Sequence, residues 1–214
     1  MAKKLGKVEK PPAEKFKTVR KLFFIPLVFA PLQGEPELLK LVGSYWKQAR
    51  KQVKSLEEKL ALVTRVYHEL VASGGGEGAK AIEALSIGSH QMVKSILDRG
   101  AELQPIEDGD LLAEFMDWSR CLSVGLQSKQ VFGVVYQSYL DAQKKRNERI
   151  ASRIDETLAG DEVGLLLMRE DHQIQFPPDI QVFYVAPPGL DAIKRWFRER
   201  ETEPQAKPQA KKEA

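Results

Sequence analysis

The strongest constraint on the fold is an alternation of short apolar runs with longer amphipathic stretches. The short runs, each typical of a strand, are KLFFIPLVFA (21–30), LALVTRVYHELV (60–71), ELQPIED (102–108), EVGLLLM (162–168) and DIQVFYVA (179–186). Continuous apolar runs are expected of strands that are buried on both faces, and β-branched residues favour the second run as a strand. Because helices of ten or more residues separate the strands of βαβ units, the alternation predicts a parallel sheet.

The intervening stretches repeat apolar residues with helical spacing. Helical patterns cover residues 36–59, 77–85, 89–100, 110–126, 129–158 and 190–200, and a flexible loop is expected at 73–76. We therefore expect a single, helix-rich α/β domain of three layers, with a mostly parallel sheet of about five strands.

Polar tails flank this domain. Residues 1–17 are rich in Lys, and residues 201–214 repeat polar residues around Pro204 and Pro208. Both segments lack the apolar residues that would offset the entropy of ordering, so we expect two disordered tails around a domain at 18–200.

The positive charge of the chain lies in the first tail. The whole chain carries +3, residues 1–17 carry +4 and residues 201–214 are neutral, so residues 18–200 carry −1. Phosphate binding needs cations clustered on a folded face, so this distribution gives no strong nucleic-acid signal.

The single cysteine and the apolar runs bear on the compartment. Cys121 has no second cysteine with which to form an internal disulfide, which fits a reducing compartment. The apolar run 22–32 is too short to span a membrane, and no secretory signal core follows the N-terminal lysines. We therefore expect a cytoplasmic protein without a membrane span.

Two polar residues in the helix 129–158 mark a candidate site. On a 3.6-residue period, Asn147 falls on the apolar stripe of this helix, so its amide points toward the core and needs hydrogen bonds. Arg146 lies beside that stripe, nearer the rim. The two residues either bind a ligand or act as a structural clamp, Arg146 on a carboxylate and Asn147 on a loop backbone.

His172 follows the strand 162–168 by four residues, where the sheet should have its carboxyl edge. Ligands of open α/β sheets bind at this edge. The imidazole could act as a general base or bind a metal, and a solvated surface histidine is the equal alternative.

Carboxylates end two other strands. Glu69 closes the strand 60–71, where a carboxylate is costly unless an Arg or a metal pairs with it. Strand alternation sends His68 to the opposite face, so His68 is expected to be a satisfied edge histidine. Glu107 closes the strand 102–108 in the same way, although Glu107 and Asp108 also fit the acidic start of a helix.

No motif names a cofactor. The chain lacks G-x-G-x-x-G, G-x-x-x-x-G-K-[ST], H-E-x-x-H and G-x-S-x-G, and it has no Cys/His cluster with metal-ligand spacing. Cysteine-metal and serine-hydrolase chemistries are therefore not expected, and the cofactor stays unknown.

The helix RNERIASRI, followed by a strand and His172, resembles the TraB/GumN/Tiki-type α/β family. That family pairs an Arg-Asn or Arg-Asp helix with a downstream strand ending in Gly-x-x-His, and its first strand also leads to Gly-x-x-His. In Tiki-like members the polar cluster is a metal-dependent hydrolase site. The resemblance implies that Arg146, Asn147 and His172 match one half of this set and that Glu69 matches its acidic element.

The sequence departs from the family pattern at two places. The first strand ends FFIPLVFAPLQG without a histidine, and the glycine of the second motif is absent before His172. The resemblance therefore implies a member that has lost the metal-hydrolase set.

Three functional hypotheses remain open. The first is an α/β domain that binds a small polar ligand without clear catalysis, in a pocket formed by Glu69, Glu107, Arg146, Asn147 and His172. The second is a protein-interaction module or homo-oligomer with an aromatic helix face of Tyr136, Tyr139, Trp196 and Phe197. The third is a hydrolase assisted by a divalent metal.

Overall fold

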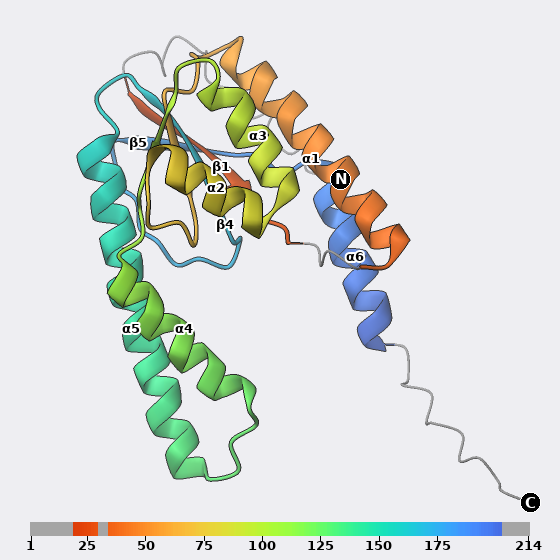
Figure 1. The fold of residues 1–214 in the computed structure, drawn as a ribbon, viewed down its shortest axis with the longest axis vertical. Coiled ribbons are helices and arrows are strands. Elements are labelled where there is room, and N and C mark those ends of the chain that lie inside the picture. The colour runs from red at the N-terminus through yellow and green to blue at the C-terminus, as the bar shows by residue number, and fades with distance from the viewer. Residues whose placement is uncertain (1–18, 30–33, 203–214) are drawn as a thin grey trace, which may run out of the picture.

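Five strands form one parallel sheet, as the alternation predicts (Figure 1). The computed structural model describes residues 19–29 and 34–202. In chain order the elements are β1 (Arg20–Pro26), α1 (Pro36–Glu57), β2 (Arg65–His68), α2 (Gly75–Leu85), α3 (Ile87–Leu97), β3 (Glu102–Gln104), α4 (Gly109–Ser123), α5 (Lys129–Thr157), β4 (Val163–Met168), β5 (Ile180–Tyr184) and α6 (Pro188–Thr202). Of the two expected tails, only residues 201 and 202 are described, and they belong to the helix α6 rather than to a tail.

The strand order is β3-β2-β4-β1-β5, and every neighbouring pair is parallel. The most apolar strand, β4, lies in the centre between β1 and β2. All strands therefore end at one edge of the sheet, which we call the carboxyl edge.

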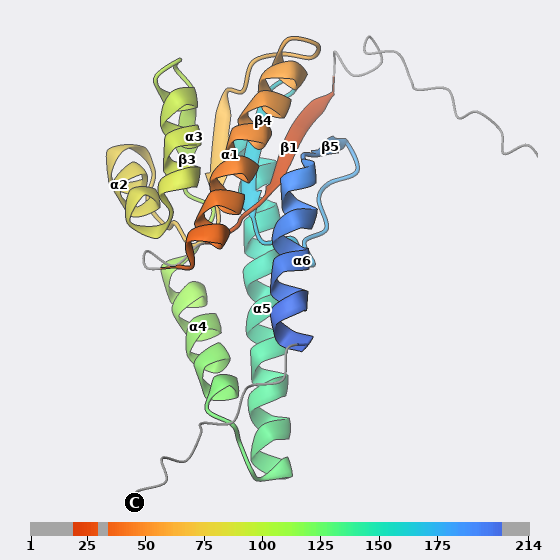
Figure 2. The same ribbon diagram turned by 90° about the vertical axis from the view of Figure 1, so that its right-hand side faces the viewer.

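Helices cover both faces of this sheet and give the expected three layers. Phe23 and Ile25 of β1 belong to one core, which also contains residues of α1, α3 and α6. Leu22 and Phe24, the alternate residues of the same strand, belong to a second core with α5. Figures 1 and 2 show α1, α3 and α6 on one side of the sheet and α5 on the other. Burial on both faces explains why β1 and β4 are continuous apolar runs.

Several boundaries differ from the prediction. The first strand ends at Pro26, and only residues 65–68 of the apolar run 60–71 form a strand. Residues 58–60 instead close the end of α1, because the amide of Leu60 donates to the carbonyl of Leu56 at 2.9 Å. The third strand stops at Gln104 because Pro105, which has no amide hydrogen, follows it. The expected loop at 73–76 is shortened, since α2 begins at Gly75, whose φ is +55°.

The helix α4 and the first half of α5 extend beyond the sheet as an antiparallel pair (Figures 1 and 2). We call residues 109–145 the hairpin. The second half of α5 continues without a break along the sheet, where Ile150 and Ile154 enter the second core.

No helix among the described residues has the length and apolar character to cross a membrane.

Two helical glycines should respond in opposite ways to substitution by Ala. A Cβ at Gly88, in the first turn of α3, would lie 2.2 Å from Cδ1 of the buried Trp46, whereas a Cβ at Gly43 in α1 would meet nothing within 4 Å. We expect Gly88→Ala to lower the free energy of unfolding by about 1–3 kcal/mol through overpacking. Gly43→Ala should raise it by about 0.5–1 kcal/mol through helix propensity. Urea unfolding followed by circular dichroism measures both, and equal effects would contradict the close packing of α1 on α3.

Candidate functional site

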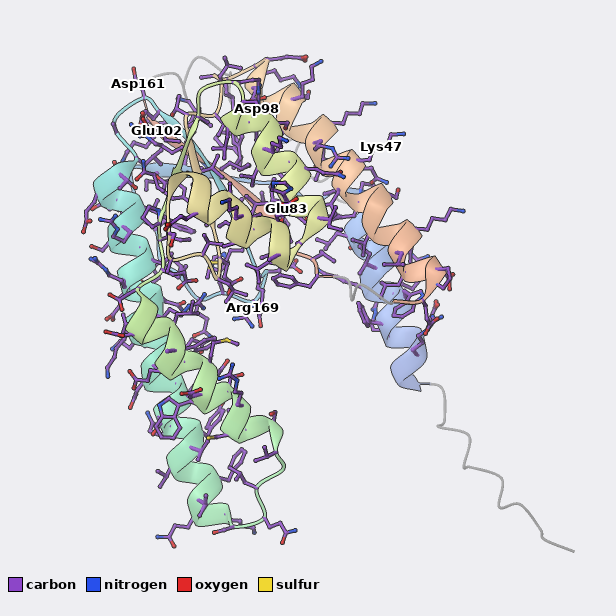
Figure 3. The ribbon with its side chains drawn as sticks, in the orientation of Figure 1. Lys47, Glu83, Asp98, Glu102, Asp161 and Arg169 are labelled. Carbon is purple, nitrogen blue, oxygen red and sulfur yellow. The ribbon has the colours of Figure 1, made fainter. Side chains whose placement is uncertain are left out.

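All five predicted site residues lie at the carboxyl edge of the sheet. Glu69 follows β2 directly, Glu107 lies in the loop after β3, His172 lies in the loop after β4, and Arg146 and Asn147 lie where α5 passes this edge. Figure 3 shows the two edges of the sheet: Glu102 and Asp161 lie at the strand beginnings and Arg169 lies at the strand ends. The convergence follows from the parallel sheet, because its strands all end on the same side.

A buried cluster of Arg146, Glu69 and Glu107 forms the centre of this edge, and we call it the Arg146 cluster. Nε of Arg146 donates to Oε2 of Glu107 at 2.9 Å, and Nη2 donates to Oε1 of Glu69 at 3.1 Å and also to Oε1 of Glu107. The side chain of Arg146 is 2% exposed and that of Glu69 is 0% exposed. The guanidinium carbon lies 4.9 Å from the ring centre of Phe115 in α4.

Backbone amides complete the pairing of both carboxylates. Oε1 of Glu107 accepts from the amide of Leu70 at 2.9 Å, and Oε2 of Glu69 accepts from the amide of Arg169 at 2.8 Å. The side chain of Arg169 adds a second donor to Glu69, from Nε at 3.0 Å. Leu70 has a φ of +68°, a conformation that costs a non-glycine residue free energy, and its bond to Glu107 helps to hold it there.

The charge of Arg146 is retained inside this cluster. Burial on its own lowers the pKa of the guanidinium, but the hydrogen bonds and negative charges of Glu107 and Glu69 outweigh it, so the pKa is raised overall. Two carboxylates and one guanidinium leave the cluster with one excess negative charge, which the partly exposed Arg169 offsets. The prediction that Arg146 lies nearer the rim of the core was wrong. The side chain of Arg146 is buried because both of its carboxylate partners are buried.

The Arg146 cluster borders a cavity of about 10 Å³, which is the space of roughly one water molecule. Its lining comprises Glu69, Gln143, Arg146, Asn147, Met168, Arg169, Asp171 and His172. Glu107 does not line it and contacts Arg146 and the amide of Leu70 instead. The predicted site residues therefore lie close together, but the cavity between them has no room for a ligand larger than water.

His172 is half-buried at the side of this cavity. Its Nδ1 accepts from the amide of Ile174 at 3.2 Å, and its ring meets Phe24 edge-on with 4.8 Å between centroids. Burial lowers the pKa of the imidazole. One side of the ring packs on the second core, and the rest of the ring is partly exposed.

Asn147 connects the small cavity to a larger space. It also lines a hollow of about 600 Å³, which we call the polar hollow, formed by Leu140, Asp141, Gln143, Lys144, Asn147, Glu148, Ala151, Gln173 and Gln175. Asn147 is buried, and within residues 19–29 and 34–202 no hydrogen bond to its side-chain amide is found. The loop backbone that the clamp interpretation required is therefore not bonded to this amide in the described part of the chain.

His68 and Asp108 have structural roles. His68 lies on the opposite face from Glu69, as alternation predicts, and its Nε2 pairs with Oγ of Ser89 at 3.1 Å. Burial lowers the pKa of His68 to about 4. Asp108 caps α4 by accepting from the amides of Asp110 and Leu111, each at 3.1 Å.

The predicted aromatic face does not form one surface. Tyr136 and Tyr139 lie on α5, whereas Trp196 and Phe197 lie on α6. Trp196 is buried in the first core, and Tyr139 packs on Phe115 with 5.3 Å between ring centres. Tyr136 and Phe197 remain exposed, on separate elements.

A second hollow, of about 350 Å³, was not predicted from the sequence. It lies between α1 and the α2–α3 junction, and Trp46, Arg50, Leu85 and Ile87 are among its lining residues. Nε1 of Trp46 and Nη1 of Arg50 are buried there without a hydrogen-bond partner in the described ranges. Trp46 lies on the apolar stripe of the helix 36–59, which core packing explains equally well, so the sequence pattern contains no signal for this second hollow.

Comparison of the chain with protein-family models, with curated proteins and with solved structures finds no match. The resemblance to the TraB/GumN/Tiki-type family therefore stays a prediction.

Replacing Arg146 should destabilise the fold far more than replacing Arg169. Arg146→Met leaves two buried carboxylates without their cation, so we expect a loss of about 3–5 kcal/mol in the free energy of unfolding. Arg169→Ala removes a partly exposed side chain that offsets one negative charge of the cluster, while its amide still donates to Glu69, so the loss should be smaller, about 1–2 kcal/mol. Urea unfolding gives both values.

A third variant separates charge burial from packing. Adding Glu69→Gln and Glu107→Gln to Arg146→Met removes the uncompensated charges, so it should recover more than half of the loss. No recovery would show that the Arg146 cluster matters through shape alone.

His68 should make stability depend on pH in mildly acidic solution. Its folded pKa of about 4 lies below the ordinary value of 6.5, so the unfolded chain takes up this proton first as the pH falls. The stabilisation is complete above pH 6.5 and is lost as the pH falls toward 4, by about 3 kcal/mol. The loss between pH 7 and 4 should be smaller in His68→Gln than in the wild type by this amount. Parallel pH profiles for the two proteins would contradict a neutral, buried His68.

Proposed function

We propose that this chain is an α/β domain that binds a small polar molecule at the carboxyl edge of its sheet, without catalysis. The observation that carries the proposal is Asn147, a residue 8% exposed whose side-chain amide lines the polar hollow and has no hydrogen-bond partner among the described residues. A ligand in the hollow would exchange the contact of this amide with solvent for a hydrogen bond, which contributes about 0.5–1.5 kcal/mol net.

The lining of the polar hollow indicates the chemistry of the ligand. Three glutamines, Gln143, Gln173 and Gln175, offer further amides, while Asp141 and Glu148 are balanced only in part by Lys144. Amides both donate and accept hydrogen bonds. This lining favours a hydroxyl-rich or zwitterionic molecule, such as a sugar, a polyol or an amino acid, over an anion.

The Arg146 cluster supports binding rather than catalysis. A general base must be free to take up a proton from the substrate. The oxygens of Glu69 and Glu107 instead accept from Arg146, Arg169 and the amide of Leu70. Within the described ranges no group of three or more His, Cys, Asp or Glu side chains could hold a metal ion. The cluster serves in this proposal as the rigid floor of the site.

The remaining expectations belong to the same proposal. A TraB-like domain that has lost its metal-hydrolase set fits a site in which the carboxylates hold an arginine. A cytoplasmic location fits a chain whose single cysteine is Cys121.

A thermal-shift screen with monosaccharides, polyols and free amino acids tests this function. A ligand at about 100 times its Kd stabilises a protein by roughly 2.7 kcal/mol, which corresponds to a rise of a few degrees in Tm. We expect at least one compound to give this rise in the wild type, a much smaller rise in Asn147→Ala and an unchanged rise in Ser152→Ala. Ser152 lies on the same helix but is exposed and bonds to Glu156, so it is the matched control.

Two results would count against the proposal. One is that no compound of these classes raises the Tm of the wild type. The other is that Asn147→Ala responds as strongly as Ser152→Ala, which would place the ligand elsewhere.

A further inference from the structure

The hairpin leaves many apolar side chains in contact with water. Val124 at its tip is 73% exposed and Val134 is 61% exposed, while Val131, Phe132 and Tyr136 are each close to half exposed. In α4 only Phe115 is buried. Large exposed apolar patches are rare on monomers and mark interaction surfaces.

The exposed residues of α5 lie beside an apolar stripe of the same helix that packs against α4. Val135, Ala142 and Arg146 are buried along α5 at helical spacing. Phe132, Tyr136 and Leu140 follow one another at four-residue intervals on the adjoining stripe, and the rings of Phe132 and Tyr136 stack at 5.7 Å. The apolar arc of α5 is therefore wider than α4 alone can cover, as in helices that have two neighbours in a bundle.

Charges are nearly absent from this surface. Between Arg120 and Asp141 the single charged residue is Lys129. Depletion of charge at the centre of a patch is typical of protein interfaces.

The charges that flank the patch are complementary between the two helices. In α4, Asp110, Glu114 and Asp117 outnumber Arg120 and give a net charge of −2. In residues 129–145 of α5, three lysines outnumber Asp141 and give +2, and the connection 124–128 carries no charge. A second hairpin placed with its α4 against α5 would pair these charges twice, because a two-fold axis repeats each contact.

We propose that two copies of this chain pair through their hairpins, with α4 of each copy against α5 of the other in a four-helix bundle. A two-fold axis along the hairpin makes neighbouring helices antiparallel, which is the arrangement of up-down-up-down bundles. The free part of α5, residues 129–145, is roughly 25 Å long at about 1.5 Å per residue, and α4 is of similar length.

The charge balance favours a second copy over a lipid surface. Helices that lie on anionic membranes carry an excess of Lys and Arg on their polar face. The hairpin has no such excess, since the −2 of α4 cancels the +2 of α5.

Sedimentation velocity on the full chain, from about 1 to 100 µM, tests the pairing. We expect a concentration-dependent dimer in the wild type. Phe132→Lys should weaken the dimer by at least about 100-fold in Kd, because each interface carries the change twice. Phe197→Lys is the matched control, since this phenylalanine of α6 is equally exposed and lies outside the hairpin, and its Kd should equal that of the wild type.

Charge reversal tests the contact between α4 and α5. One variant carries Lys144→Glu and Lys145→Glu, and the other carries Glu114→Lys and Asp117→Lys. Each variant alone should dimerise weakly, because like charges then face each other, whereas an equal mixture should form a heterodimer with nearly the wild-type Kd. Circular dichroism of each variant confirms that the monomer is folded.

Three results would overturn the proposal. The first is a wild-type monomer throughout the concentration range, and the second is a dimer that Phe132→Lys leaves unchanged. The third is a wild-type monomer that sediments with phosphatidylserine-containing vesicles and loses this binding in Phe132→Lys, which would assign the hairpin to a membrane surface. The ligand-binding proposal needs only one copy of the chain, so a wild-type monomer leaves it intact, and a failed thermal-shift screen leaves the pairing of the hairpins intact.

Discussion

The pairing of Arg146 with two buried carboxylates is the interaction on which the carboxyl edge depends. It joins the end of β2, the loop after β3 and the middle of α5, which are far apart in the sequence. A buried charge without a partner costs several kcal/mol, so each of these segments is held in place by the others. The same pairing closes the centre of the edge and leaves the polar hollow, on the outer side of Asn147, as the open space.

The architecture could be predicted because burial on both faces leaves a clear trace in a strand. The run LFFI in β1 and the run VGLLLM of β4 have no polar alternation, which indicates a covered parallel sheet. Strand lengths could not be predicted as well, since apolar residues such as Val63 and Val71 flank β2 and are buried in the same core. The central place of β4 also leaves no local signal, because strand order depends on pairing between distant segments.

The site could be predicted in outline for a different reason. Parallel strands bring their carboxyl ends together, so Glu69, His172 and the middle of α5 were expected to converge. Helical periodicity gives the direction of a side chain but not its depth, which is why the burial of Arg146 was missed. The same limit applies to the hairpin: the continuous pattern from 129 to 158 does not reveal where the sheet ends and where α5 stands free.

The unbroken course of α5 has a mechanical consequence. One rod of 29 residues runs from the exposed tip, past Asn147, to the second core. Leu140 and Lys144, in the free part of the rod, also line the polar hollow beside Asn147. Pairing of the hairpins and ligand binding at the polar hollow would then change each other's affinity by the same factor, as thermodynamic linkage requires.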